Sequence, residues 1–191
     1  MALPTWKYAS TQVEDLVFNG VADSPGAWLL TALELKTAAD RLDYFRFPVR
    51  PEEPCLSLVP VHRYLMGMSL ENLLKGVLAV QGEEVLTDGK LSKKFSKHKL
   101  CKLADSIDSS GFTFTLTDRE VLGTLELFVV WAGRYPLPTS IDKLIVRGGS
   151  SREYDAERNL WDRLYEALSQ VAWIQKPDGK LFLNGYFERR P

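Results

Sequence analysis

The chain contains 191 residues, of which 45% are hydrophobic and 26% are charged, and its formal net charge is −1. This length suits a single domain that can bury a sizeable core without disulfides or metal ions. With a net charge so close to zero, the chain cannot attract nucleic acid through its overall charge. A nucleic-acid partner would have to bind a local basic patch.

Cysteine content and hydropathy narrow the class further. The two cysteines, Cys55 and Cys101, are too few for a disulfide framework and are not spaced as the ligands of a metal site. The N-terminus lacks the basic and apolar segments of a signal peptide, and no apolar run reaches the roughly 18 residues of a membrane span. We therefore expect a cytoplasmic protein of one domain, residues 1–191, with no metal, no cofactor and no membrane partner.

The first strong helical pattern covers residues 24–46. Ser24 can cap its N-terminus, and Pro25 suits the first helical position. Apolar residues cover most of its circumference, which predicts a helix surrounded by other helices. Four prolines within residues 47–60 then predict an extended connector, because proline cannot continue a helix.

The second helix is predicted at residues 61–81, where apolar residues recur on one face with the helical period. These residues are Met66, Leu70, Leu73, Leu74, Val77 and Val80. Glu71 and Lys75 point well away from the centre of that face, one helical turn apart and with the glutamate first, as in a favourable ion pair. Two interpretations stay open: a solvated pair on the surface, or a pair at a groove between bundles or protomers.

Residues 90–102 form a basic run that holds six lysines and His98. A short helix is predicted at residues 98–109. A neutral imidazole among lysines can bind phosphate or act as a general base near neutral pH, and the alternative is a local hydrogen bond at the helix start. Cys101 is about one turn from His98, but no third residue is found that could orient a catalytic pair.

A further helix is predicted at residues 117–132, with Thr117 and Glu120 in the pattern of a capping box. Pro136 disfavours the helical conformation at the residue before it. The helix should therefore end near Gly133 or Arg134.

Arg134 follows this helix, between Trp131 and Tyr135 in the sequence. The helix dipole favours a cation there, and the planar guanidinium can stack on rings and bind a carboxylate or phosphate through two bonds. Two hypotheses stay open. Arg134 is a buried clamp to a helix carboxylate such as Glu71, or it contacts an anion at the rim of a pocket.

The C-terminal part is predicted to hold a loop at residues 139–153, a helix at residues 154–172 and a tail at residues 173–191. A Pro-Asp-Gly turn between short apolar runs predicts a small hairpin in the tail. Four to five main helices and almost no strand predict an all-α antiparallel helical bundle, with its core at residues 24–172.

Three segments, residues 64–82, 97–107 and 129–138, together resemble the HEPN-type helical bundles of prokaryotes. The resemblance implies an antiparallel bundle, often dimeric, in toxin–antitoxin, phage-defence or RNA-processing systems. Ribonuclease members of that family carry an arginine a few residues before a histidine. Neither His62 nor His98 has an arginine at that spacing, so this motif is absent.

We therefore expect a non-catalytic HEPN-like protein that acts through a protein or RNA partner, in a toxin–antitoxin or phage-defence setting. One alternative is a metal-independent ribonuclease whose relocated site uses His98 and Arg134, and another is a structural or interaction protein of unknown process. The candidate binding residues are Glu71, Lys75, His98, Trp131, Arg134 and Tyr135. A homodimer is also expected, from the resemblance and from the apolar residues 181–187.

Overall fold

The structure, a computed structural model of the chain, describes Phe18 and residues 20–43, 58–107, 112–132, 151–175 and 181–183. Over these residues the protein is all-α, as predicted, and each predicted helix is present with its ends shifted by a few residues. The helices are α2 (Pro25–Asp43), α3 (Val59–Val80), α4 (Leu100–Ser106), α5 (Leu116–Leu127) and α6 (Ser151–Ala172), and a π-helical turn, η1 (Phe128–Ala132), continues α5.

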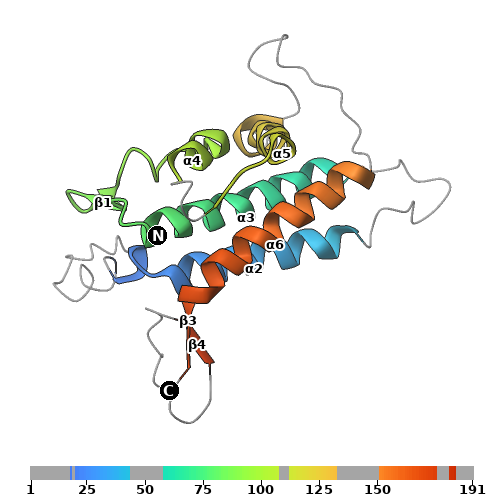
Figure 1. The fold of residues 1–191 in the computed structure, drawn as a ribbon. Coiled ribbons are helices and arrows are strands. Elements are labelled where there is room, and N and C mark those ends of the chain that lie inside the picture. The colour runs from blue at the N-terminus through green and yellow to red at the C-terminus, as the bar shows by residue number, and fades with distance from the viewer. Residues whose placement is uncertain are drawn as a thin grey trace, which may run out of the picture.

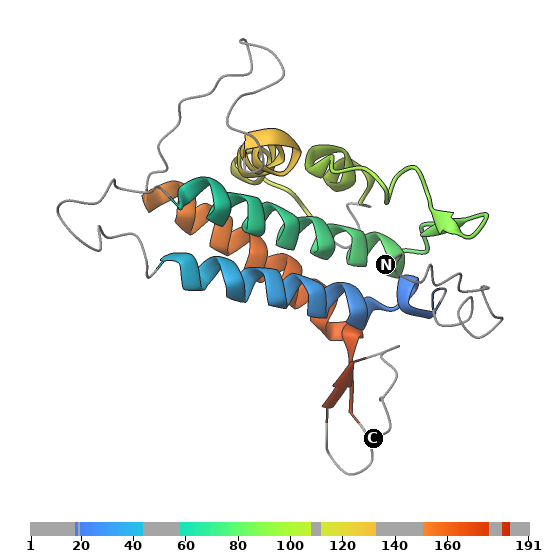
Figure 2. The ribbon, with the colours of Figure 1, turned by 180° about the vertical axis from the view of Figure 1, so that it is seen from behind.

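Helix α3 lies at the centre of the arrangement. Figure 1 shows α2 and α6 against one side of α3, and α4 and α5 against the other side. The view from behind in Figure 2 shows the same two groups, with α2 running opposite to α3. Because neighbours cover α3 on two sides, nearly every residue from Met66 to Leu78 is buried, the polar ones included.

Two glycines let other helices approach α3 closely. A Cβ atom added at Gly67 would lie 2.5 Å from Cγ2 of Val129 in η1. One added at Gly76 would lie 2.6 Å from Cδ2 of Leu168 in α6. Both distances are shorter than real Cβ contacts, so a side chain at either position would force the neighbouring side chain or helix to shift.

A buried polar contact joins α2, α3 and α6. The hydroxyl of Ser69 donates to the carbonyl oxygen of Ala32, 2.7 Å away, and accepts from the indole nitrogen of Trp161 at the same distance. Each group is thereby satisfied without water, which is the condition for burying it at little cost.

Arg63 forms a second buried contact, between α3, α6 and η1. Its side chain is 0% exposed, and Nη2 donates to Oε2 of Glu153 at 2.7 Å and lies 3.4 Å from Oε1 of Glu157. The rings of Phe128 and Tyr154 cover the guanidinium at 5.5 and 5.3 Å. Burial by itself lowers the pKa of Arg63, but the hydrogen bond to Glu153 and the charge of Glu157 raise that pKa above its ordinary value.

The N-terminus of α5 differs from the prediction. The capping box consists of Thr115 and Asp118, and not of Thr117 and Glu120. The hydroxyl of Thr115 accepts from the backbone of Asp118 at 3.1 Å, and the Asp118 carboxylate accepts from the backbone of Thr115 at 2.7 Å. Asp118 also pairs with Arg163 of α6 at 2.9 Å, a tertiary contact that favours this earlier start.

Two further predictions need correction. Helix α6 begins at Ser151, so the end of the predicted loop at residues 139–153 is helical, and the rest of that loop lies outside the described residues. Val80, assigned to the apolar face of α3, is 44% exposed because it stands at the last turn of that helix.

Two small hairpins complete the described structure. One was not predicted: β1 (Leu86–Thr87) and β2 (Lys90–Leu91) pair antiparallel across Asp88 and Gly89, which both have positive φ. An Asp-Gly pair is a strong signal for such a turn. The predicted hairpin of the tail is confirmed, as β3 (Trp173–Gln175) pairs antiparallel with β4 (Leu181–Leu183). Within the described segments no helix is long and apolar enough to cross a membrane.

Candidate functional site

The middle of α3 holds an ion pair between Glu71 and Lys75. Lys75 Nζ donates to Glu71 Oε1 at 2.6 Å, and the two side chains are only 2% (Glu71) and 7% (Lys75) exposed. The interpretation as a solvated surface pair is therefore wrong. The pair is buried because α4 and the segment before it pack against this part of α3.

His98 makes the third contact of this cluster. Its Nδ1 lies 2.9 Å from Oε2 and 3.1 Å from Oε1 of Glu71. A carboxylate can only accept hydrogen bonds, so Nδ1 must carry the proton and donate. In the neutral ring the remaining lone pair is then on Nε2, at the far edge of the imidazole, and the His98 side chain is 45% exposed.

These three contacts fix the orientation of the imidazole. Glu71 cannot turn away without leaving the ammonium of Lys75 unpaired inside the protein, which costs on the order of 3–5 kcal/mol for a fully buried pair. A buried ion pair therefore holds one half-exposed histidine in place. Such a carboxylate–imidazole arrangement selects one tautomer and presents the other nitrogen to the solvent.

A basic hollow lies along α4 and the segment before it. Its volume is about 240 Å³. Its lining consists of Lys93, Lys94, Lys97, Lys99, Lys102, Leu103 and Ser106. His98 stands in the sequence between two of these lysines, but it does not line the hollow, and its ring bonds to Glu71.

Acidic side chains neutralise only part of this charge. Lys94 lies 2.7 Å from Glu83, and Lys99 lies 3.3 Å from Glu126. The remaining three of the five lysines have no acidic partner among the residues that the structure describes. They are Lys93, Lys97 and Lys102. The hollow therefore has the chemistry of an anion site, in a chain whose net charge is −1.

No known family, characterised protein or solved structure matches this chain. The cluster and the hollow must therefore be interpreted through their own chemistry. In the described part of the chain no group of acidic, histidine or cysteine side chains is arranged to hold a metal ion.

The predicted site residues are only partly brought together. Glu71, Lys75 and His98 meet in one cluster, although His98 is 27 residues from Glu71 in the sequence. Arg134 and Tyr135 lie outside the described residues, and for Trp131 only the backbone, in η1, is described. The clamp between Arg134 and Glu71 therefore stays a prediction, and the described partners of Glu71 are Lys75 and His98.

Arg63 of α3 has the role that was predicted for Arg134: it is a buried arginine that bonds to a carboxylate of another helix. Sequence reasoning did not single it out, although a signal was present. Arg63 lies three residues before Met66 and seven before Leu70, and thus on the apolar face of the helix. A charge on such a face indicates a buried partner, because an unpaired buried charge is too costly to keep.

Cys101 does not form a pair with His98, whose Nδ1 is bonded to Glu71. Burial, together with the charges of Glu126 and Asp105, raises the pKa of the Cys101 thiol above its ordinary value. The thiolate is the reactive form, so this cysteine is a poor nucleophile near neutral pH.

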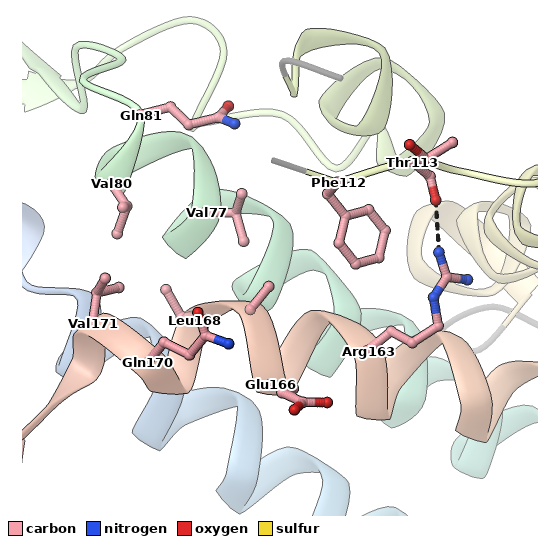
Figure 3. Close-up of a pocket in the computed structure, with 11 residues that line it drawn as sticks. Val77, Val80, Gln81, Phe112, Thr113, Arg163, Glu166, Leu168, Gln170 and Val171 are labelled. Atoms are coloured by element: carbon pink, nitrogen blue, oxygen red, sulfur yellow. Dashed lines mark hydrogen bonds between the residues drawn. The ribbon is translucent and has the colours of Figure 1, made fainter. Parts of the chain in front are cut away.

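A second, larger hollow of about 650 Å³ lies between the C-terminal ends of α3 and α6 (Figure 3). Phe112 and several valines line it together with Gln81, Gln170 and Glu166. Its cation, Arg163, is held by the carbonyl oxygen of Thr113 at 2.6 Å and by Asp118. Because Asp118 already neutralises the charge of Arg163, the larger hollow is less suited to bind an anion than the lysine-lined hollow.

Proposed function

We propose that this protein is a HEPN-like helical protein that acts by binding RNA through the lysine-lined hollow along α4, in a toxin–antitoxin or phage-defence setting. The observation that carries the proposal is the group of five lysines around one hollow, three of them without a described acidic partner. Phosphates of a nucleic acid are bound mainly by such charges. The sequence resemblance to a family active in RNA processing supports RNA as the partner.

Local charge suits this role better than overall charge would. With a net charge of −1, the chain as a whole does not attract nucleic acid, so binding is confined to the basic hollow. Three uncompensated lysines would release about two counterions from a single strand, which predicts a moderate salt dependence. A homodimer, which the sequence predicts, would present this surface twice and raise the apparent affinity.

The test is the affinity for a labelled oligoribonucleotide, measured by fluorescence anisotropy at several salt concentrations. The double substitution Lys93→Glu and Lys97→Glu should weaken binding by about tenfold or more near 100 mM salt. Its matched control is Arg152→Glu with Arg158→Glu, which changes the net charge equally at exposed positions of α6. Equal losses in both variants, or no loss in either, would reject the hollow as the binding surface.

A second candidate function is metal-independent ribonuclease activity, and the contact between Glu71 and His98 is the observation that favours it. Nε2 of His98 would take the proton of a ribose 2′-hydroxyl. The oxygen would attack the adjacent phosphorus and expel the 5′-oxygen, which takes a proton from a lysine or from water. Cleavage in EDTA that yields 2′,3′-cyclic phosphate ends and disappears in His98→Ala would establish this activity.

A further inference from the structure

We infer that His98 is a positioning residue for the lysine-lined hollow. By bonding to Glu71 of α3, it holds its two neighbours in the chain, Lys97 and Lys99, on the side that forms the hollow. The inference rests on the proposed RNA binding and names the side chain that arranges the binding surface. It does not require the imidazole to line the hollow or to touch the RNA.

The segment between β2 and α4 is fixed by a buried side chain at each end. Phe95 and Leu100, the first residue of α4, are both 0% exposed. Residues 96–99 between them are exposed, and two of the lysines of the hollow belong to this stretch. Within it, the hydrogen bonds to α3 come from the ring of His98. His98 therefore joins an exposed, lysine-bearing stretch to the central helix.

The backbone conformation explains how one contact can arrange two lysines. Residues 98 and 99 are not helical, and Lys99 has φ −113° and ψ 82°, which is nearer to an extended chain than to a helix. In an extended chain, successive side chains point to opposite sides. The ring of His98 is turned to Glu71, and its neighbours Lys97 and Lys99 both line the hollow, which His98 does not. The observed placement is the one that this alternation predicts.

The acceptor of this contact is itself held in place. The side chain of Glu71 is 2% exposed and bonds to Lys75 at 2.6 Å. Nδ1 of His98 lies 2.9 and 3.1 Å from its two oxygens. Carboxylate oxygens only accept hydrogen bonds, so Nδ1 donates whether the ring is neutral or protonated. The contact can therefore anchor the segment in either state of the imidazole.

Positioning affects binding because long side chains lose freedom when they bind a ligand, and this loss lowers the affinity. Lys97 has no acidic partner among the described residues that would hold it, and Lys99 lies 3.3 Å from Glu126 of α5. Without the contact between His98 and Glu71, residues 97–99 could rotate, and two of the five lysines could leave the hollow. RNA would then have to order this stretch when it binds.

The first measurement is limited proteolysis of the folded, full-length protein with trypsin, which cleaves after lysine. Cleavage after Lys97 and Lys99 reports how often this stretch leaves its place on α3. In His98→Ala it should become about tenfold faster, the ratio expected for the loss of one hydrogen bond to a charged group. Cleavage after Lys90, an exposed residue of β2, is the internal control and should keep its rate. Equal rates after Lys97 and Lys99 in the two proteins would overturn the inference.

The second measurement is the affinity for a labelled oligoribonucleotide, by fluorescence anisotropy, in a matched pair of variants. His98→Ala removes the donor and should weaken binding about threefold to tenfold, as expected when one or two lysine side chains must be ordered by the ligand. In His98→Asn the amide nitrogen takes the place of Nδ1 and can donate to Glu71. It should therefore restore most of the affinity and the slow cleavage by trypsin. A loss of packing alone would not be repaired by the smaller asparagine.

The outcomes separate this inference from the proposed function. If the wild-type protein binds RNA and His98→Ala binds it equally well, or if His98→Asn restores nothing, the role of His98 is overturned and lysine-dependent binding stays intact. Absence of binding by the wild-type protein, or binding that ignores Lys93→Glu with Lys97→Glu, would overturn the proposed function itself. In that case the trypsin rates still decide whether His98 anchors the segment.

Discussion

Two ionic clusters lie on α3, and they differ in what covers them. Around Arg63 the cation itself is enclosed: its side chain is 0% exposed and the rings of Phe128 and Tyr154 lie on it, whereas its partner Glu153 is 44% exposed. Around Glu71 both members of the ion pair are buried, and the exposed group is a third member, the imidazole of His98, which is 45% exposed.

The difference shows what each cluster can do. The Arg63 cluster joins α3 to α6 and η1 and has no exposed polar atom on its arginine, so it serves the packing of the bundle. The Glu71 cluster holds a half-exposed imidazole through a buried carboxylate, so it supports a group that the solvent can reach. Burial of a charge therefore indicates a functional site only when the charge orients something that a ligand can reach.

The largest effect is expected from Arg63→Met. It removes the cation between α3 and α6 and leaves the nearly buried carboxylate of Glu157 without that charge, at a cost of about 3–5 kcal/mol. The urea midpoint should fall accordingly. Arg63→Lys keeps the charge but loses the planar fork, and should recover only part of the loss. An unchanged midpoint in Arg63→Met would contradict the clamp.

A somewhat smaller effect is expected from Glu71→Gln. The amide keeps the shape and can still accept from Lys75, but the buried ammonium loses its countercharge, at a cost of about 2–3 kcal/mol. Equilibrium unfolding in urea gives this value. An unchanged urea midpoint in Glu71→Gln would mean that the buried ammonium of Lys75 does not need the charge of this carboxylate.

Alkaline pH should destabilise the α4 side of the molecule. The raised pKa of Cys101 means that the folded state holds the thiol proton more tightly than the unfolded chain. This contribution is fully present below the ordinary thiol pKa and is lost as the pH rises through the raised value. Thermal unfolding measured across that range should show a smaller decline in Cys101→Ser. Identical pH profiles for the two proteins would rule out this contribution.

The smallest effect on stability is expected from His98→Asn. The side chain is half-exposed and the pair of Glu71 and Lys75 remains, so the free energy of unfolding should change by no more than about 0.5 kcal/mol. A large loss of stability in this variant would place His98 with Arg63, as part of the packing, and remove the contrast between the two clusters.

The helices could be predicted from the sequence because their signals are local. Spacing of apolar residues, prolines and small caps located α2, α3 and α6 to within a few residues. The prediction placed the capping box of α5 two residues too late. The observed box uses Asp118, which also pairs with Arg163, a residue far away in the sequence. Local patterns cannot contain that contact.

The candidate site was predicted in part. The sequence alone identified Glu71 and Lys75 as an ion pair and His98 as the histidine of a basic run, because both patterns lie within a few residues. Only the tertiary structure decided that the pair is buried and that His98 bonds to Glu71. Whether a charge on α3 faces water depends on the segments that pack over it, and the partners of Arg63 come from α6, 90 residues along the chain. Packing between distant segments decides how far the Glu71–Lys75 pair is removed from water. Because the pair is buried, Glu71 is held in place and can orient the exposed imidazole of His98.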